Sequence, residues 1–153
     1  MDRASYPYQS VQLSSVVNMT SEPGLDQRFY EAFLSVCNEQ GFNCIDGDVA
    51  ISVKLTKFRL LTRSLKSSYS SEYSVVLNAD VILNYPDGEE KRIDQLSSEF
   101  DESFIAQNTV EEINTNQELV TARALEELAR RIIHYIIYKQ TELDQKHGIK
   151  KAQ

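Results

Sequence analysis

The chain has 153 residues, of which 41% are hydrophobic and 25% are charged. This length and composition suit one folded domain with a real core, and they exclude a disordered or fibrous chain. The formal net charge of −7 argues against nucleic acid as the main partner, because binding to phosphates requires a basic surface. Charged side chains such as Arg123 and Glu127 interrupt the most apolar stretch, residues 119–138, which excludes a transmembrane helix.

The first predicted elements are a strand and a helix. Residues 9–19 alternate between apolar and polar side chains and predict a strand with Val11 and Val17 on the same face. Ser21 is the expected N-cap of the following helix, and Gly41 is its expected end. Apolar residues recur between them at helical spacing, which predicts one buried face.

A second strand is predicted on both sides of residue 56. Apolar residues occupy one phase of the alternation up to Leu55 and the opposite phase from Phe58 onward. A slip of one residue is typical of a β-bulge, so we expect a bulge at residues 56–57.

The third and fourth strands form a predicted hairpin. Apolar side chains fill alternate positions from Tyr73 to Tyr85, which is the clearest strand pattern in the chain. A Pro-Asp-Gly turn at residues 86–88 follows. Residues 90–100 are then expected to pair back as a more polar strand.

One long helix is predicted near the end of the chain, over residues 109–147. Two candidate capping boxes begin at Thr109 and Thr115, and Gly148 is the expected end. The expected buried stripe consists of Leu119, Ala122, Leu125, Leu128, Ala129, Ile132, Ile133 and Ile136. The residues expected on the solvent side are Arg123, Glu127, Arg130 and Arg131.

These elements predict an α+β fold of order β-α-β-β-β-α, with two helices packed on one face of a four-stranded mixed sheet. The β-α-β start implies that the first two strands are parallel and joined by a right-handed crossover. We expect a single domain over residues 9–147, with flexible tails at residues 1–8 and 148–153.

Cys37 and Cys44 lie on either side of Gly41. A disulfide between them would close a short loop and stabilise the fold by about 2–3 kcal/mol. Two unrelated buried thiols are the alternative. The sequence has no CxxC motif and only two histidines, so zinc-finger and thioredoxin-like sites are excluded, and neither a metal nor a cofactor is expected.

No motif of an active site is present, and an enzyme is not predicted. The sequence has no Gly-rich phosphate loop, nucleophile elbow or HExxH motif. His134 is expected on the surface of the last helix. The acidic pairs at residues 89–90 and 111–112 are expected to serve solubility and the helix dipole rather than acid–base catalysis.

One segment of this acidic chain carries an unusual concentration of positive charge. No acidic residue occurs between Asp48 and Glu72. The cations in this interval are Lys54, Lys57, Arg59, Arg63 and Lys66. Together with the hydroxyls and Tyr69 near the expected hairpin tip, they suit an anionic, partly apolar ligand. The alternative is a solvated hairpin whose lysines protect an edge strand from aggregation.

The stretch Val-Val-Asn-Met-Thr-Ser-Glu-Pro-Gly-Leu, residues 16–25, leads into the first predicted helix. It resembles the segment between the first strand and the first helix in the lipopolysaccharide-assembly lipoproteins, the LptE family. Three further features occur in the order of that family: the alternating strand at residues 72–81, the Pro-Asp-Gly turn, and the last-helix segment at residues 122–129. The resemblance covers about residues 9–138.

The resemblance implies the periplasmic domain of an outer-membrane lipoprotein, without its signal and lipid-bearing cysteine. Such a domain sits inside the LptD β-barrel, assists its assembly, and helps to deliver lipopolysaccharide to the cell surface. Membrane association would come from an N-terminal lipid anchor. In the family, lipopolysaccharide contact is associated with basic residues near the hairpin tip, which Arg59, Arg63 and Lys66 match by position.

A different envelope interaction module is the second hypothesis. It would be similar to the amino-terminal domain of TolB or to the curli-secretion lipoproteins, and it would bind protein partners without specific affinity for lipopolysaccharide. The long terminal helix over residues 109–147 favours the first hypothesis.

Overall fold

The structure is a computed structural model with six regular elements. Its backbone is described for residues 10–41, 43–65, 70–105 and 109–152, and its side chains for residues 10–41, 43–63, 71–105 and 109–136. In chain order the elements are β1 (Val11–Asn18), α1 (Leu25–Gln40), β2 (Val49–Leu65), β3 (Ser70–Asn84), β4 (Glu90–Ile105) and α2 (Val110–Ala152). The predicted β-α-β-β-β-α order is confirmed.

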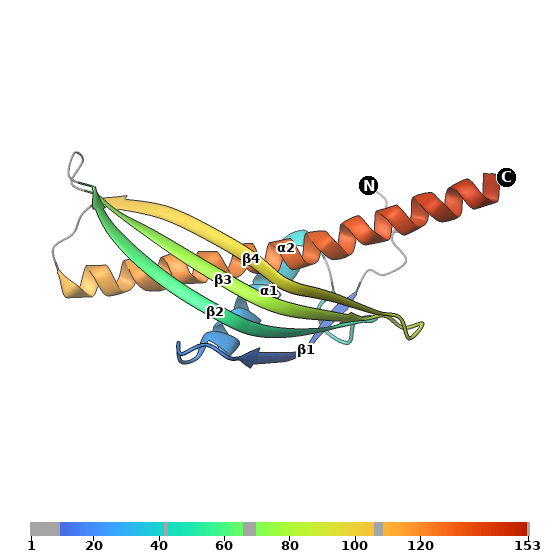
Figure 1. Cartoon of the computed structure of the whole chain (residues 1–153), viewed down its shortest axis with the longest axis horizontal. Helices are drawn as coiled ribbons and strands as arrows, with labels where there is room; N and C mark the ends of the chain where they lie inside the picture. The colour runs from blue at the N-terminus through green and yellow to red at the C-terminus, as the bar shows by residue number, and fades with distance from the viewer. Residues whose placement is uncertain (1–9, 42, 66–69, 106–108, 153) are drawn as a thin grey trace.

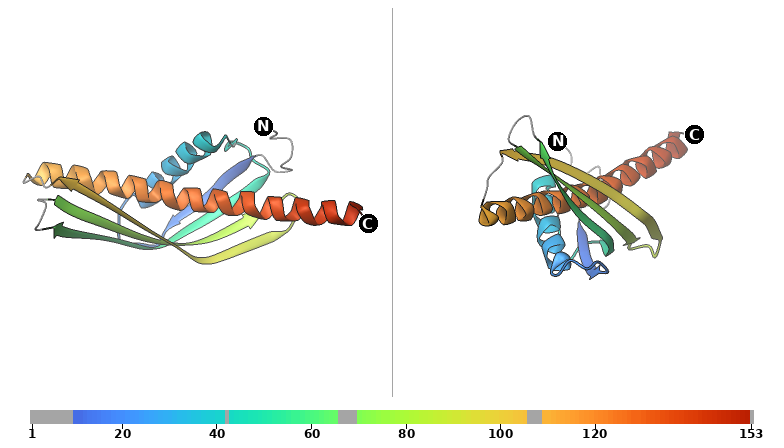
Figure 2. Two further views of the ribbon diagram at one scale, coloured as in Figure 1. Left: turned by 90° about the horizontal axis from the view of Figure 1, so that it is seen from above. Right: turned by 60° about the vertical axis from the view of Figure 1, so that its left-hand side comes forward.

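The four strands form one sheet in the order β1-β2-β3-β4. β1 runs parallel to β2, whereas β2, β3 and β4 are antiparallel neighbours, which confirms the predicted parallel start. Both helices lie on one side of the sheet, and the other side is uncovered (Figures 1 and 2). We call this uncovered side the open face. The fold is therefore a two-layer α+β sandwich with one solvated sheet face.

The core fills the space between the sheet and the two helices. The alternation predicted for β3 is confirmed, because its odd-numbered residues from Tyr73 to Leu83 are all buried. α1 adds Phe29 and Phe33, whose ring centroids lie 6.1 Å apart. α2 contributes the apolar stripe that covers β3 and β4. Its buried residues are Val120, Thr121, Ala124, Leu125, Leu128, Ala129, Ile132, Ile133 and Ile136.

The loop between β1 and α1 is organised by the side chain of Asn18. Its Oδ1 accepts hydrogen bonds from the backbone N–H of Thr20 at 3.0 Å and from the Thr20 hydroxyl at 2.6 Å. Its Nδ2 donates to the carbonyl of Glu22 at 2.6 Å. Gly24, with φ of 73°, is the N-cap. The prediction of Ser21 as N-cap is wrong, because Asn18 and Thr20 satisfy the polar groups of the loop and the helix begins only after the left-handed glycine.

α1 ends at Gly41, as predicted. This glycine has φ of 77°, and its N–H donates to the carbonyl of Asn38 at 3.3 Å, which is the geometry of a left-handed C-cap. Just beyond the helix end, Cys44 is joined to Cys37 in a disulfide with a Cα–Cα distance of 6.2 Å. The disulfide ties the last turn of α1 to the segment that leads into β2.

β-bulges occur in both β1 and β2. The bulge in β2 lies between Leu55 and Lys57, where the change of phase predicts it. A second bulge lies between Leu13 and Ser15 of β1. It reverses the phase of the strand, so Val17 is 42% exposed. The prediction that Val17 shares a buried face with Val11 is therefore wrong.

α2 begins as predicted but is longer. The Thr109 hydroxyl accepts the Glu112 N–H at 3.2 Å, whereas Thr115 lies inside the helix and bonds back to the Glu111 carbonyl. The helix continues through Gly148, because one glycine costs a helix only about 1 kcal/mol relative to alanine. At 43 residues and 1.5 Å per residue it is about 65 Å long. Its C-terminal part projects beyond the sheet (Figure 1).

Two positions in the stripe predicted for α2 are wrong. Leu119 is 38% exposed and Ala122 is half-buried, whereas Val120 and Ala124 are fully buried. The buried stripe is thus rotated slightly in its first turns. Over its whole length, α2 packs against α1, β3 and β4.

Three arginines of α2 fasten the helix to its neighbours instead of pointing only into solvent. Arg123 forms an ion pair with Glu102 of β4. Arg130 binds Glu39 of α1 at 3.2 Å. Arg131 donates to the backbone carbonyl of Ser97 in β4 at 3.1 Å. The long helix is therefore held to β4 and to α1 by charge-assisted contacts, in addition to the packing of its apolar stripe.

Candidate functional site: a cationic row on the open face of the sheet

Four of the five cations singled out in the sequence lie on the open face of β2. Up to Leu55, the odd-numbered residues of this strand are buried against the helices, and the bulge at residue 56 then reverses the phase. After the bulge, Phe58 and Leu60 pack against the core. The cations therefore stay exposed on the opposite side, and we call them the cationic row: Lys54, Lys57, Arg59 and Arg63. Lys66 lies outside the described residues.

The bulge is what places these cations on one face. Lys54 precedes the bulge and has an even number, whereas the three cations after it have odd numbers. In an uninterrupted strand, even and odd positions point to opposite sides. If the strand kept Thr56 but continued without a bulge, the later cations would point into the core.

The ends of the cationic row face carboxylates, and its centre does not. In the register with β3, Lys54 is opposite Asp80 and Arg63 is opposite Glu72. Asp80 also accepts the backbone N–H of Gln95 at 2.9 Å. Among the described residues, no member of the row forms an ion pair within 4.0 Å.

The centre of the row consists of Lys57 and Arg59, which face uncharged neighbours. Lys57 lies opposite Asn78, and Arg59 lies opposite Val76. These two cations therefore have no carboxylate directly across from them. Their charge is the part of the row that is available to an external anion.

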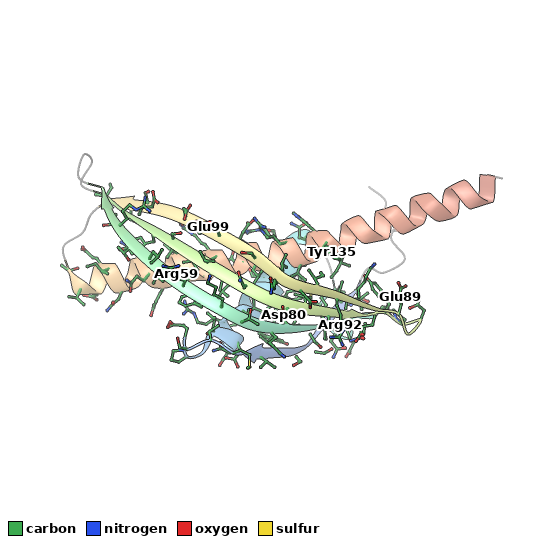
Figure 3. The ribbon with its side chains drawn as sticks, viewed as in Figure 1. Arg59, Asp80, Glu89, Arg92, Glu99 and Tyr135 are labelled. Atoms are coloured by element: carbon green, nitrogen blue, oxygen red, sulfur yellow. A yellow bond between two sulfur atoms is a disulfide. The ribbon has the colours of Figure 1, made fainter. Side chains whose placement is uncertain are left out.

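The open face is positive on one side and negative on the other. Val76 pairs with Arg59 on β2 and with Glu99 on β4, and Asp101 follows two residues later on β4. Figure 3 shows Arg59 on β2 and Glu99 on β4, on either side of β3. Neighbouring strands are about 4.8 Å apart. The cations and carboxylates are thus separated by about two strand spacings, and they polarise the face.

An apolar side chain interrupts the charges. Leu61 lies between Arg59 and Arg63 on β2 and is 46% exposed. The row spans about 30 Å from Lys54 to Arg63 at about 3.3 Å per residue. The described part of the row is thus an extended stripe along the strand. The mixture of cations with an exposed aliphatic group suits an amphiphilic anion.

Other features of the described residues offer less material for chemistry. No group of three His, Cys, Asp or Glu side chains is arranged to hold a metal ion, and no described helix is long and apolar enough to cross a membrane. His134 is exposed on α2. Two shallow hollows are present, one between α1 and α2 beside Arg28 and one beside β1 next to Tyr30.

The structure is a small α+β domain with one helix-covered and one open sheet face, and the cationic row lies on the open face. The sequence model of the LptE family, described as lipopolysaccharide-assembly, matches residues 8–136. The chain belongs to the LptE family. It is a lipopolysaccharide-assembly lipoprotein of the Gram-negative envelope, from a family that is not enzymatic.

Solved structures support the same fold at low sequence identity. A protein of Caulobacter crescentus CB15 is 13% identical with a TM-score of 0.54, over 82% of this chain and 90% of that one. The hypothetical protein CT253 of Chlamydia trachomatis is 9% identical with a TM-score of 0.53, over 84% of this chain and 97% of that one. Identities this low support the fold alone. No protein of curated function matches the sequence.

Proposed function

We propose that this protein is a non-enzymatic outer-membrane lipoprotein that acts as plug and partner of the LptD β-barrel and binds lipopolysaccharide along the cationic row. Membership of the LptE family supports the assembly role. The observation that carries the ligand proposal is that Lys57 and Arg59 on the open face have no carboxylate opposite them to balance their charge. An anionic lipid with phosphates and acyl chains matches both these cations and the exposed Leu61 beside them.

The shape of the domain supports the plug proposal. The lumen of a large outer-membrane barrel is polar, and the open face presents polar and charged side chains along three long strands. The opposite face of the sheet is already covered by α1 and α2, so it requires no further partner. A polar barrel wall would therefore meet a mainly polar surface, with scattered apolar side chains such as Leu61 and Val17.

The disulfide supports a periplasmic location. Disulfides such as Cys37–Cys44 persist in oxidising compartments, which include the bacterial periplasm. In this proposal a lipid at the N-terminus of the native precursor holds the domain at the periplasmic face of the outer membrane. The anchor concentrates the domain beside the barrel, so a modest intrinsic affinity is sufficient for stable association.

The ligand proposal is tested by reversing the charge of the central cations. The double substitution Lys57→Glu with Arg59→Glu is expected to weaken binding of purified lipopolysaccharide at least about tenfold, because a lost charge-assisted contact costs about 1.5–3 kcal/mol. Both side chains are exposed, so the melting temperature should change little. Binding of the wild-type protein should also weaken with rising ionic strength.

A matched control is available at the base of β4. The double substitution Lys91→Glu with Arg92→Glu makes the same change in net charge near the β3–β4 turn. It also removes the exposed ion pair between Arg92 and Glu90 at 3.4 Å, a contact that contributes little to stability. It should change the affinity for lipopolysaccharide less than about threefold, since net charge alone has a small, screened effect at a distance. Equal losses in the two double variants would show that total charge, rather than the cationic row, governs binding.

The barrel proposal needs a separate measurement. Coexpression with the cognate LptD barrel, followed by purification through a tag on this chain, should yield a stoichiometric complex. Absence of the complex, together with absence of lipopolysaccharide binding, would favour an envelope module that binds other proteins.

A further inference from the structure

We propose that the free edge of β1 is a strand-addition site, where an extended segment of the barrel partner pairs with β1 and places a lysine or arginine side chain beside Asp26. The inference rests on the proposed barrel partnership and adds the surface and the type of segment that it uses. Three features of the described residues carry it: the composition of the two sheet edges, the direction of the backbone groups of β1, and a groove along this edge.

The two edge strands of the sheet, β1 and β4, differ in their content of charged residues. β4 has seven charged residues among its 16, and Arg131 of α2 occupies the carbonyl of Ser97 on this strand at 3.1 Å. Charges and covering side chains are the usual protection of an edge strand. β1, with the sequence VQLSSVVN, has no charged residue and no proline. Its edge thus lacks charges and proline, two of the features that discourage pairing with another strand. The bulge between Leu13 and Ser15 limits the longest regular part of this edge to residues 15–18.

The backbone of β1 offers hydrogen-bonding groups along this edge. At the start of the strand, the outward N–H of Val11 is already taken by the Asn43 carbonyl at 2.8 Å. Beyond the bulge, the Met19 N–H donates inward to the Leu55 carbonyl at 2.8 Å. Because alternate residues of a strand direct their N–H groups to the same side, the N–H groups of Val16 and Asn18 point outward. The free part of the edge therefore follows the bulge.

One of the two shallow hollows described above lies beside this part of the edge, and we call it the groove. Residues 13–16 of β1 form one wall, and Asp26, Gln27 and Tyr30 of α1 form the other. Tyr30 is 44% exposed. An edge strand flanked by a helix is the arrangement by which extended segments are recognised, since backbone pairing gives affinity and the flanking side chains give specificity.

Charge identifies the occupant of the groove. Asp26 is the charged side chain that lines it, and it forms no ion pair with a described residue. A second copy of this chain that paired through β1 would bring two Asp26 carboxylates to one interface, and β1 has no cation to neutralise them. A segment of another protein with a basic residue can pair with the outward backbone groups of β1 and form an ion pair with the Asp26 carboxylate.

The test uses the complex of this chain with the cognate LptD barrel. A photoreactive p-benzoylphenylalanine at Ser15, in the groove, should crosslink to one short barrel segment that contains a lysine or arginine, whereas the same group at Ser35 of α1 should not. Val16→Pro removes an outward N–H, and Asp26→Lys reverses the charge. Each should weaken binding to the barrel at least tenfold. Glu31→Lys makes the same charge change on the same helix and should stay within about twofold.

The outcomes separate the inference from the proposed function. If the wild-type chain does not bind the barrel, both fail. If it binds, and the Asp26→Lys and Glu31→Lys variants bind equally well without a crosslink from position 15, the strand-addition site is wrong and the barrel partnership stands. Asp26→Lys leaves the backbone intact, so it decides the matter even if Val16→Pro does not fold. A dimer crosslinked through position 15 would instead identify a second copy as the occupant and overturn the proposal.

Discussion

The guanidinium of Arg130 on α2 binds the carboxylate of Glu39 on α1 at 3.2 Å, across 91 residues of sequence. The hydrogen bond and charge of Arg130 lower the pKa of Glu39 below its ordinary value, and Glu39 in turn raises the pKa of Arg130. Glu126 and Glu127 approach the same guanidinium at 3.4 and 3.6 Å. This contact joins the two helices through polar groups, in addition to their apolar packing.

The Glu39 contact predicts a pH-dependent contribution to stability. Because folding lowers the pKa of Glu39, its contribution is complete above the ordinary carboxyl pKa of about 4.3 and disappears as the pH falls through the lowered value. We expect Glu39→Gln to decrease the melting temperature by roughly 1–3 °C at pH 7, as for an exposed pair. At strongly acidic pH, thermal unfolding should give the same midpoint for variant and wild type. Glu31→Gln, an exposed residue of the same helix without an ion pair to a described residue, should show no such dependence.

The disulfide predicts a loss of stability on reduction. The loop closed between Cys37 and Cys44 is short, with a sequence separation of seven, and a loop of this size corresponds to about 2–3 kcal/mol on the chain-entropy estimate. Urea unfolding of the wild-type protein should shift to lower denaturant when a reductant is added. The Cys44→Ala variant should unfold at a urea midpoint near that of the reduced wild-type protein, and addition of a reductant should not change this midpoint. Identical midpoints for oxidised and reduced wild type would contradict the prediction.

Deletion of Thr56 is expected to be tolerated far better than insertion of one residue after Lys57. Without Thr56, the pairs Leu55–Ala79 and Lys57–Asn78 follow each other in a regular ladder, so Lys57 and Arg59 stay on the open face while Phe58 and Leu60 stay against the core. An alanine inserted between Lys57 and Phe58 would direct Arg59 into the core and expose Phe58 and Leu60, a change that should cost at least about 4 kcal/mol or prevent folding. Thr56→Ala removes a hydroxyl that bonds to the Asn78 carbonyl at 3.2 Å, worth about 1 kcal/mol or less at an exposed position. Circular dichroism and thermal unfolding of the three variants make the comparison. An unfolded deletion variant, or an insertion variant as stable as the wild type, would contradict the prediction.

The elements with a strong apolar period were predictable from the sequence. The β2 bulge is visible because apolar residues change phase on either side of it. The β1 bulge is not, since the Ser-Ser-Val-Val segment at residues 14–17 permits either phase. The N-cap of α1 was missed because Ser21 offers a plausible local cap, whereas the structure satisfies the loop through Asn18, three residues earlier.

The candidate site was only partly predictable. The concentration of cations between Asp48 and Glu72 is a property of the sequence, and the cationic row contains the members that the structure describes. Which cations face Asp80 or Glu72, and which face neutral residues, depends on strand register, and the sequence does not specify register. The groove beside β1 was missed for the same reason, because its two walls come from different elements.

The arrangement of charge on the open face has a consequence for orientation. Positive side chains along β2 and carboxylates along β4 give the surface an in-plane dipole, perpendicular to the strands. A partner with complementary charge can dock in one rotational setting, whereas a half-turn about the sheet normal would bring like charges together. A partner that covers the open face is therefore expected to bind in one orientation.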